Sequence, residues 1–226
     1  MDAWTTERES RQGASGSRIW FRSKLRGWGE IAGAFATLEC ALWSSVKAQV
    51  AWGLLLLIVV TFATVRGGRT TMEMGLSGPG TRKGWWILSA ALLTAALLVT
   101  AASRLGTLHY GHSGGRALLG AGLYTVWAFV QEFMAQAFIL LRLRQLLSRK
   151  WLAVLSTAVV FSVAHIPNLV LIGLTFCGGA LLSALFLRYR NLYVLGLTHA
   201  LLGLALAISM PGWLTHHMKV GLAYFG

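Results

Sequence analysis

Residues 169–187 read LVLIGLTFCGGALLSALFL, a stretch without a single charged side chain. A helix of roughly 20 apolar residues crosses a bilayer core about 30 Å thick. Comparable apolar stretches recur along the chain, at about 30–46, 49–65, 85–103, 117–141, 151–166 and 192–210. The sequence therefore predicts an all-α, polytopic integral membrane bundle of about six to seven transmembrane helices.

The composition agrees with a membrane protein. Of the 226 residues, 56% are hydrophobic and 12% are charged, and the mean hydropathy is +0.63. The formal net charge of +13 comes from basic residues at the ends of apolar stretches. Nucleic-acid binding would instead place them on one face between aromatic residues. We therefore expect membrane lipids as partners and no nucleic acid.

Lys and Arg also predict the orientation. If all seven apolar stretches span the membrane, the segments between them are alternately rich and poor in Lys and Arg. Because basic residues favour the cytoplasmic side, the N terminus is expected in the cytoplasm. The expected location is the inner (plasma) membrane of a bacterium.

The chain divides into four parts. Residues 1–27 are polar and basic and are expected to form a disordered or interfacial tail. Residues 28–116 hold the N-terminal membrane helices, residues 117–210 a core that contains the candidate site, and residues 211–226 a C-terminal tail.

The distribution of acidic residues singles out Glu132. Six of the seven Asp and Glu residues lie at or before Glu73, and the seventh, Glu132, lies inside an apolar stretch. An ionisable side chain costs roughly 2.5–3.5 kcal/mol at the centre of a membrane helix, which makes it a candidate for function. The alternative is a protonated acid that hydrogen-bonds a neighbouring helix. Gln136 follows one helical turn later, on the same face.

Two histidines occupy similar settings. His165 and His199 lie in the stretches 151–166 and 192–210. A single histidine in a membrane helix more often packs than catalyses, but with Glu132 there are three such groups on three helices. At about 1.5 Å rise per residue, the three lie roughly 13 to 22 Å from basic helix ends on one side of the membrane. We therefore expect them to converge inside the bundle.

Three short motifs run through these residues. The first reads QEFMAQ at residues 131–136, the second FSVAH at 161–165 and the third HALLG at 199–203. They resemble the motifs Glu-Glu-x-x-x-Arg, Phe-x-x-x-His and His-x-x-x-Asn/Asp of the CPBP family of intramembrane proteases, which includes the CAAX prenyl endopeptidases. The resemblance covers about residues 117–210, which it identifies as a CPBP-like catalytic core.

The resemblance implies an intramembrane endopeptidase. Its substrate would be a membrane-anchored or lipid-associated peptide or protein, cleaved by water that Glu and His side chains activate. On this basis Glu132 is the general base, His165 orients the water or binds a metal, and His199 stabilises the oxyanion. The supporting residues are Gln131, Gln136, Phe161 and Asn168, the last supplying the amide that the third motif lacks.

Three points remain open from the sequence. The metal question is open: Glu132, His165 and His199 would suit a catalytic zinc as cofactor, although the chain has no His-Glu-x-x-His motif. The departures at Gln131, Gln136 and Gly203 favour a catalytically degenerate family member that acts in immunity or as a scaffold. A transporter or proton relay is less favoured, because the core offers no second acidic residue.

Overall fold

The computed structural model describes residues 3–109 and 114–226, and within these ranges the side chains from residue 23 onward. The described residues form helices and turns and no strand. The α-helices are α1 (Ala3–Leu42), α2 (Val46–Arg66), α3 (Trp86–Leu105), α4 (Gly115–Glu132), α5 (Leu141–Leu146), α6 (Lys150–Val163), α7 (Leu169–Tyr189), α8 (Leu192–Ser209) and α9 (Gly212–Thr215). A π-helix, η2 (Phe133–Leu140), joins α4 to α5, and three short 3₁₀ helices are η1 (Pro79–Arg82), η3 (His216–Met218) and η4 (Gly221–Phe225).

The predicted all-α membrane bundle is confirmed. Among the described residues, five helices are long and apolar enough to cross a membrane: α2, α3, the continuous run Gly115–Leu146, α7 and α8. The other two predicted stretches correspond to the C-terminal part of α1 and to α6, whose 14 residues fall short of the roughly 20 needed to span. Leu54, Ile58 and Leu93 are exposed, as expected of side chains that face lipid.

Helix α1 begins well before its predicted start. It runs from Ala3 through the stretch expected to be a disordered or interfacial tail, so residue 27 is not a helix boundary. The first proline of the chain is Pro79, so no proline interrupts a helix in this region. An interfacial position of this stretch stays a prediction.

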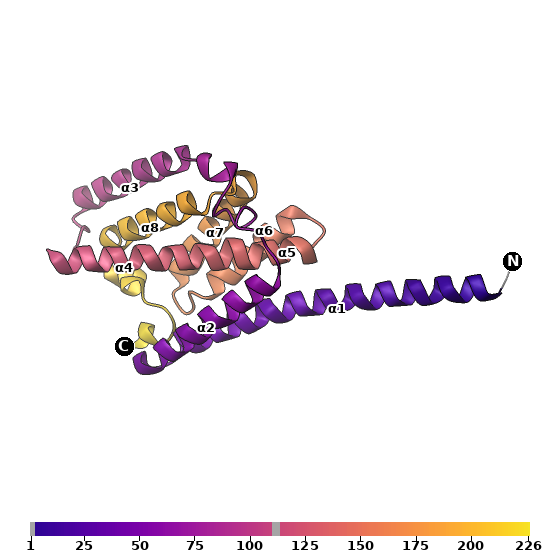
Figure 1. Ribbon diagram of the computed structural model, residues 1–226. Coiled ribbons are helices and arrows are strands. Elements are labelled where there is room, and N and C mark those ends of the chain that lie inside the picture. Colours follow the sequence, from indigo (N-terminus) through magenta and orange to yellow (C-terminus); the bar gives the residue numbers. More distant parts are fainter. Residues whose placement is uncertain (1–2, 110–113) are drawn as a thin grey trace.

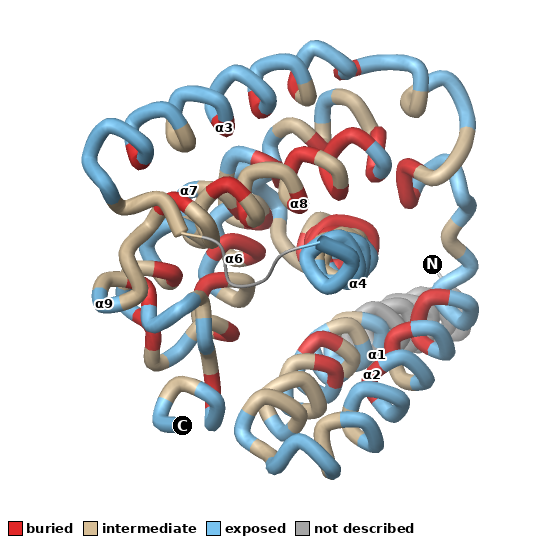
Figure 2. The backbone as a smooth tube through the Cα atoms, turned by 90° about the vertical axis from the view of Figure 1, so that its left-hand side faces the viewer, coloured by how far each residue is buried: buried red, intermediate tan, exposed pale blue. Residues whose placement is uncertain are grey.

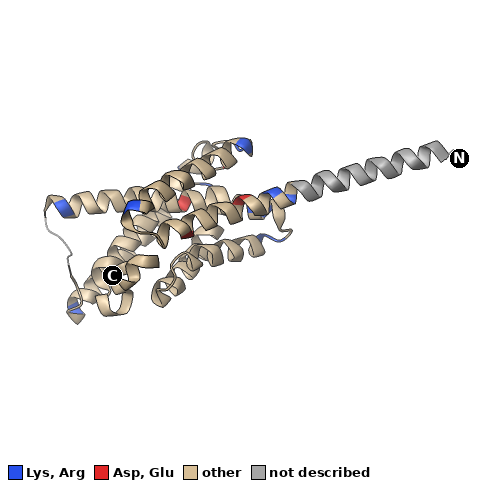
Figure 3. Ribbon diagram, turned by 90° about the horizontal axis from the view of Figure 1, so that it is seen from below, with Lys and Arg blue, Asp and Glu red and all other residues tan. Residues whose placement is uncertain are grey.

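The run formed by α4, η2 and α5 is the centre of the bundle. In Figure 2, α4 is seen end-on, with α1 and α2 on one side and α8 on another. α1 packs on α2, α3 on α8, and α6 on α7 (Figure 1), and η2 also contacts α6 and α7. Figure 3 shows Lys and Arg mainly near helix ends, with long uncharged stretches between them.

The π-helix lies in the most enclosed part of this run. Seven of its eight residues are buried, and Phe138 is fully buried beside Phe186 of α7 in the apolar core. A π-helix widens the backbone spiral and turns the following side chains away from their α-helical positions, and such segments are frequent at functional sites. It begins directly after Glu132 and thereby sets where the side chains that follow this acid point.

Candidate active site

Glu132 and His199 meet at the packed faces of α4 and α8. Glu132 is the last residue of α4, and its side chain is 1% exposed. Its Oε1 lies 2.9 Å from Nδ1 of His199, and its Oε2 accepts a hydrogen bond from Nε2 of Gln136 at 3.0 Å. When Nδ1 of His199 donates in this contact, its Nε2 is the ring nitrogen that remains available to a substrate or water. The expected convergence of these two groups is therefore observed.

His165 lies just after α6 and is held in one tautomer. Its Nδ1 is 2.8 Å from the carbonyl oxygen of Phe161, so Nδ1 donates and Nε2 is left with a free lone pair. The Phe161 ring contacts both imidazoles, with centroids 5.2 Å from His165 and 5.8 Å from His199 and near edge-on geometry. Phe161 thus links the second and third motifs and orients both histidines.

A cavity of about 80 Å³ adjoins these groups. Gln131, Phe161 and His165 line it together with apolar side chains of α1 and η2, whereas Glu132 and His199 are not among its lining residues. A water molecule needs about 10–15 Å³ of such space, so the cavity can hold several. The structure therefore divides the predicted site into a cavity wall, to which Gln131, Phe161 and His165 belong, and the Glu132–His199 pair, which does not line the cavity.

A larger apolar groove of about 670 Å³ lies between α1, α2 and α4. It shares Leu38, Leu42, Trp127 and Met134 with the wall of the small cavity, so the two spaces are neighbours.

Asn168 has a different role from the predicted one. It caps the N terminus of α7, with Oδ1 accepting from the backbone N–H of Leu171 at 3.2 Å. Its Nδ2 donates to the carbonyl oxygens of Thr215 at 2.6 Å and Lys219 at 3.1 Å. Both amide protons are therefore engaged, and Asn168 has no N–H left to stabilise an oxyanion.

Tyr124 is a residue that the sequence analysis missed. A methyl group added at Gly203, the last position of the third motif, would overlap the Tyr124 hydroxyl and lie 2.8 Å and 3.0 Å from two of its ring carbons. The tyrosine, two turns before Glu132 on α4, thus fills the space in which the family motif has an Asn or Asp side chain. The missing side chain at Gly203 was the only signal in the sequence.

The donor set does not fit a catalytic zinc. Such a site needs about three protein ligands. Within the part of the chain that the structure describes, no three His, Cys, Asp or Glu side chains are grouped to hold a metal. Glu132 and His199 bond each other, and Nδ1 of His165 bonds a carbonyl.

The comparisons with known proteins bear on this same segment. Residues 113–205 match the family described as Rce1-like, type II CAAX prenyl endopeptidase. No curated protein and no solved structure matches the chain. The matched residues include Glu132, His165 and His199 and run from the start of α4 into α8. The segment that carries the candidate site therefore matches an Rce1-like protease family of CAAX prenyl endopeptidases, and the resemblance predicted from its motifs is confirmed.

Proposed function

We propose that the chain is an intramembrane endopeptidase that hydrolyses a membrane-anchored or lipid-associated peptide or protein. The observation that carries the proposal is the 2.9 Å contact between Glu132 and His199 within the segment that matches a protease family. A buried carboxylate that accepts a hydrogen bond from Nδ1 of an imidazole stabilises the imidazolium form of that histidine. An imidazolium beside the reacting carbonyl can stabilise the negative charge that develops on the carbonyl oxygen.

The geometry favours a division of roles different from the one inferred from the motifs. Glu132 is buried, both of its oxygens are engaged, and it does not line the cavity, whereas His165 lines the cavity with a free Nε2. We therefore assign His165 as the base that takes a proton from water as the water oxygen attacks the peptide carbonyl. His199 acts in its doubly protonated form beside the Glu132 carboxylate: its Nδ1–H donates to Glu132 and its Nε2–H donates to the resulting oxyanion. The proton then passes from His165 to the leaving amine as the carbon–nitrogen bond breaks.

The test is cleavage by the full chain in proteoliposomes. The probes are a fluorogenic prenylated Cys-aliphatic-aliphatic-X peptide, which the family name suggests, its unprenylated counterpart and a single-span membrane peptide. We expect Glu132→Gln and His165→Gln each to lower the cleavage rate at least about a hundredfold. His216→Gln, a change in the C-terminal tail, is the matched control and should keep the wild-type rate. Cleavage by Glu132→Gln at the wild-type rate would refute the proposal.

One observation favours the second candidate, a degenerate family member that binds its partner without cleaving it. Gln131, at the position of the leading Glu of the first motif, lines the cavity beside His165, whereas the remaining acid, Glu132, does not. Gln131→Glu restores the acid at the cavity wall. A wild-type chain that cleaves no probe, together with a cleaving Gln131→Glu variant, would establish this candidate.

A further inference from the structure

A strongly basic cavity of about 350 Å³ lies away from the candidate site, where α1, the end of α2 and α5 meet. Five basic side chains and one acidic side chain, Glu30, are among its lining residues. The basic residues are Lys24, Arg26, Arg66, Arg69 and Arg142. So many like charges around one cavity repel one another unless an anion lies among them.

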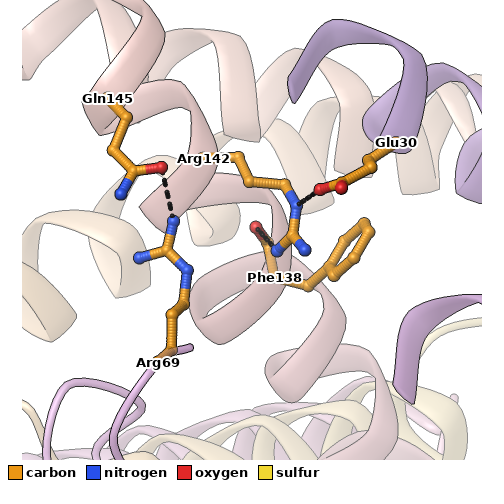
Figure 4. A network of polar contacts seen from close by, with 5 residues as sticks. All are labelled: Glu30, Arg69, Phe138, Arg142 and Gln145. Carbon is orange, nitrogen blue, oxygen red and sulfur yellow. Dashed lines mark hydrogen bonds and ion pairs between the residues drawn. The ribbon is translucent and has the colours of Figure 1, made fainter. Parts of the chain in front are cut away.

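Glu30, the one acidic residue in the lining of this cavity, forms an ion pair with Arg142, one of its five basic residues. Oε2 of Glu30 lies 2.7 Å from Nε of Arg142, whose side chain is 4% exposed. Nη1 of Arg142 donates to the carbonyl oxygen of Phe138 at 3.1 Å, and the guanidinium lies 3.8 Å from the centre of the Phe138 ring (Figure 4). Glu30 therefore pairs with a fixed, buried arginine, and no ion pair of Arg66 or Arg69 with a lining acid is seen among the described residues.

Arg69 is held in place by a neutral partner. Its Nη2 donates to Oε1 of Gln145 at 3.0 Å (Figure 4). Burial, and after it the positive charge of Arg142, lowers the pKa of Arg69. Glu73 outside the cavity and, more weakly, Glu30 in its lining oppose this shift; the Glu73 carboxylate already accepts hydrogen bonds from Thr70, and Glu30 is paired with Arg142. Arg69 is thus oriented beside a second guanidinium by a neutral amide rather than by a carboxylate.

The cavity also lies at the end of a predicted span. Arg66 is the last residue of α2, a helix long and apolar enough to cross the membrane, and Arg69 lies three residues later, in the turn that follows the helix. The end of a span lies at the depth of the lipid headgroups. Basic pockets between helices at this depth bind anionic headgroups, and the planar guanidinium fork matches the oxygens of a phosphate.

We propose that this basic cavity is a binding site for a phosphate group, supplied by an anionic phospholipid headgroup or by free phosphate. Arg69 and Arg66 bind the phosphate oxygens, while the Glu30–Arg142 pair forms the fixed floor. The site uses none of the residues of the proposed hydrolysis, so it stands or falls independently of that function.

The experiment titrates the full chain, purified in detergent, with phosphatidylglycerol and counts bound lipids by native mass spectrometry. The wild-type chain should retain one phosphatidylglycerol under conditions that remove zwitterionic phosphatidylcholine. Arg69→Gln and Arg66→Gln should each weaken this binding about tenfold, the loss expected for one charge-assisted hydrogen bond. Arg188→Gln removes the same charge from an exposed position outside the cavity and should bind as the wild type does.

A second arm separates the two sources of phosphate. Inorganic phosphate that raises the melting temperature of the wild-type chain but not of Arg69→Gln would support the site with free phosphate as its ligand. Retention of phosphatidylglycerol without any response to inorganic phosphate would support it with a lipid headgroup. Arg66 is exposed and stacks over the Phe62 ring, so Arg66→Gln leaves the fold intact. Equal binding by the wild type and both cavity variants would overturn the proposal.

Discussion

Adding one methyl group at Gly203 tests how closely the Tyr124 side chain packs against this last position of the third motif. In Gly203→Ala the new Cβ would overlap the tyrosine hydroxyl and lie 2.8 Å and 3.0 Å from two ring carbons, closer than ordinary van der Waals contact. Overpacking of this kind costs about 1–3 kcal/mol. Replacing a helical glycine by alanine gains about 1 kcal/mol. The two effects together predict a net loss of about 0–2 kcal/mol in the free energy of unfolding.

The matched control is Gly173→Ala in α7, where an added Cβ meets nothing within 4 Å. This variant should show only the gain in helix propensity, so the two substitutions should differ by about 1–3 kcal/mol. Thermal unfolding of the full chain in detergent measures the difference, and 1 kcal/mol corresponds to about 2–4 °C for a chain of this size.

A double variant isolates the cause. In a Tyr124→Ala background the overlap is removed, so Gly203→Ala should stabilise the chain as much as Gly173→Ala does. If Gly203→Ala raised the melting temperature as much as Gly173→Ala in the wild-type background, the conclusion that Tyr124 fills this space would be wrong.

Three further predictions concern contacts outside the candidate site. Glu30→Gln leaves Arg142 buried without its partner and should destabilise the chain by roughly 3 kcal/mol in denaturant unfolding, the low end for buried pairs because Glu30 is partly exposed; a loss below about 0.5 kcal/mol would show that the pair is unimportant. Asn168→Ala should speed hydrogen exchange in residues 215–219 and Asn191→Ala near residues 81–83, because each amide donates to carbonyls there; exchange that rises equally in both regions would contradict this pairing. Hydrogen bonds from Thr70 lower the pKa of Glu73, so its contribution to stability is present above its unfolded pKa and is lost as the pH falls through the lower folded value; Glu73→Gln should flatten this part of the stability profile, and an unchanged profile would exclude the effect.

The helices could be predicted from the sequence because apolar length alone defines a membrane span. The stretch predicted at 49–65 is α2 (Val46–Arg66), and the one at 192–210 is α8 (Leu192–Ser209). The meeting of Glu132 and His199 could also be anticipated, since a charge inside an apolar helix needs a partner.

Other parts of the site depend on packing that no local pattern reveals. Which side chains line the cavity depends on the rotation of each helix, and the π-helix after Glu132 alters that rotation without any Gly or Pro in residues 133–140. For this reason the sequence does not show that Gln131 lines the cavity or that Tyr124 packs against Gly203. The sequence predicts Asn168 as a supporting amide and cannot reveal its structural role, because its partners, Thr215 and Lys219, lie about fifty positions away in the sequence.

The small cavity also depends on the two ends of the chain. Ala34 and Leu38 of α1 form part of its wall, and Val220 near the C terminus forms another part. The adjacent Gly221 donates its N–H to the carbonyl oxygen of Ile166 at 2.9 Å, which holds the C-terminal tail next to His165. None of these wall residues at the two ends belongs to the 113–205 segment that matches the protease family. The matched segment supplies the polar groups, and the sequence outside it encloses them, so a shortened chain that begins after α2 or stops before Val220 would leave His165 open to the surroundings.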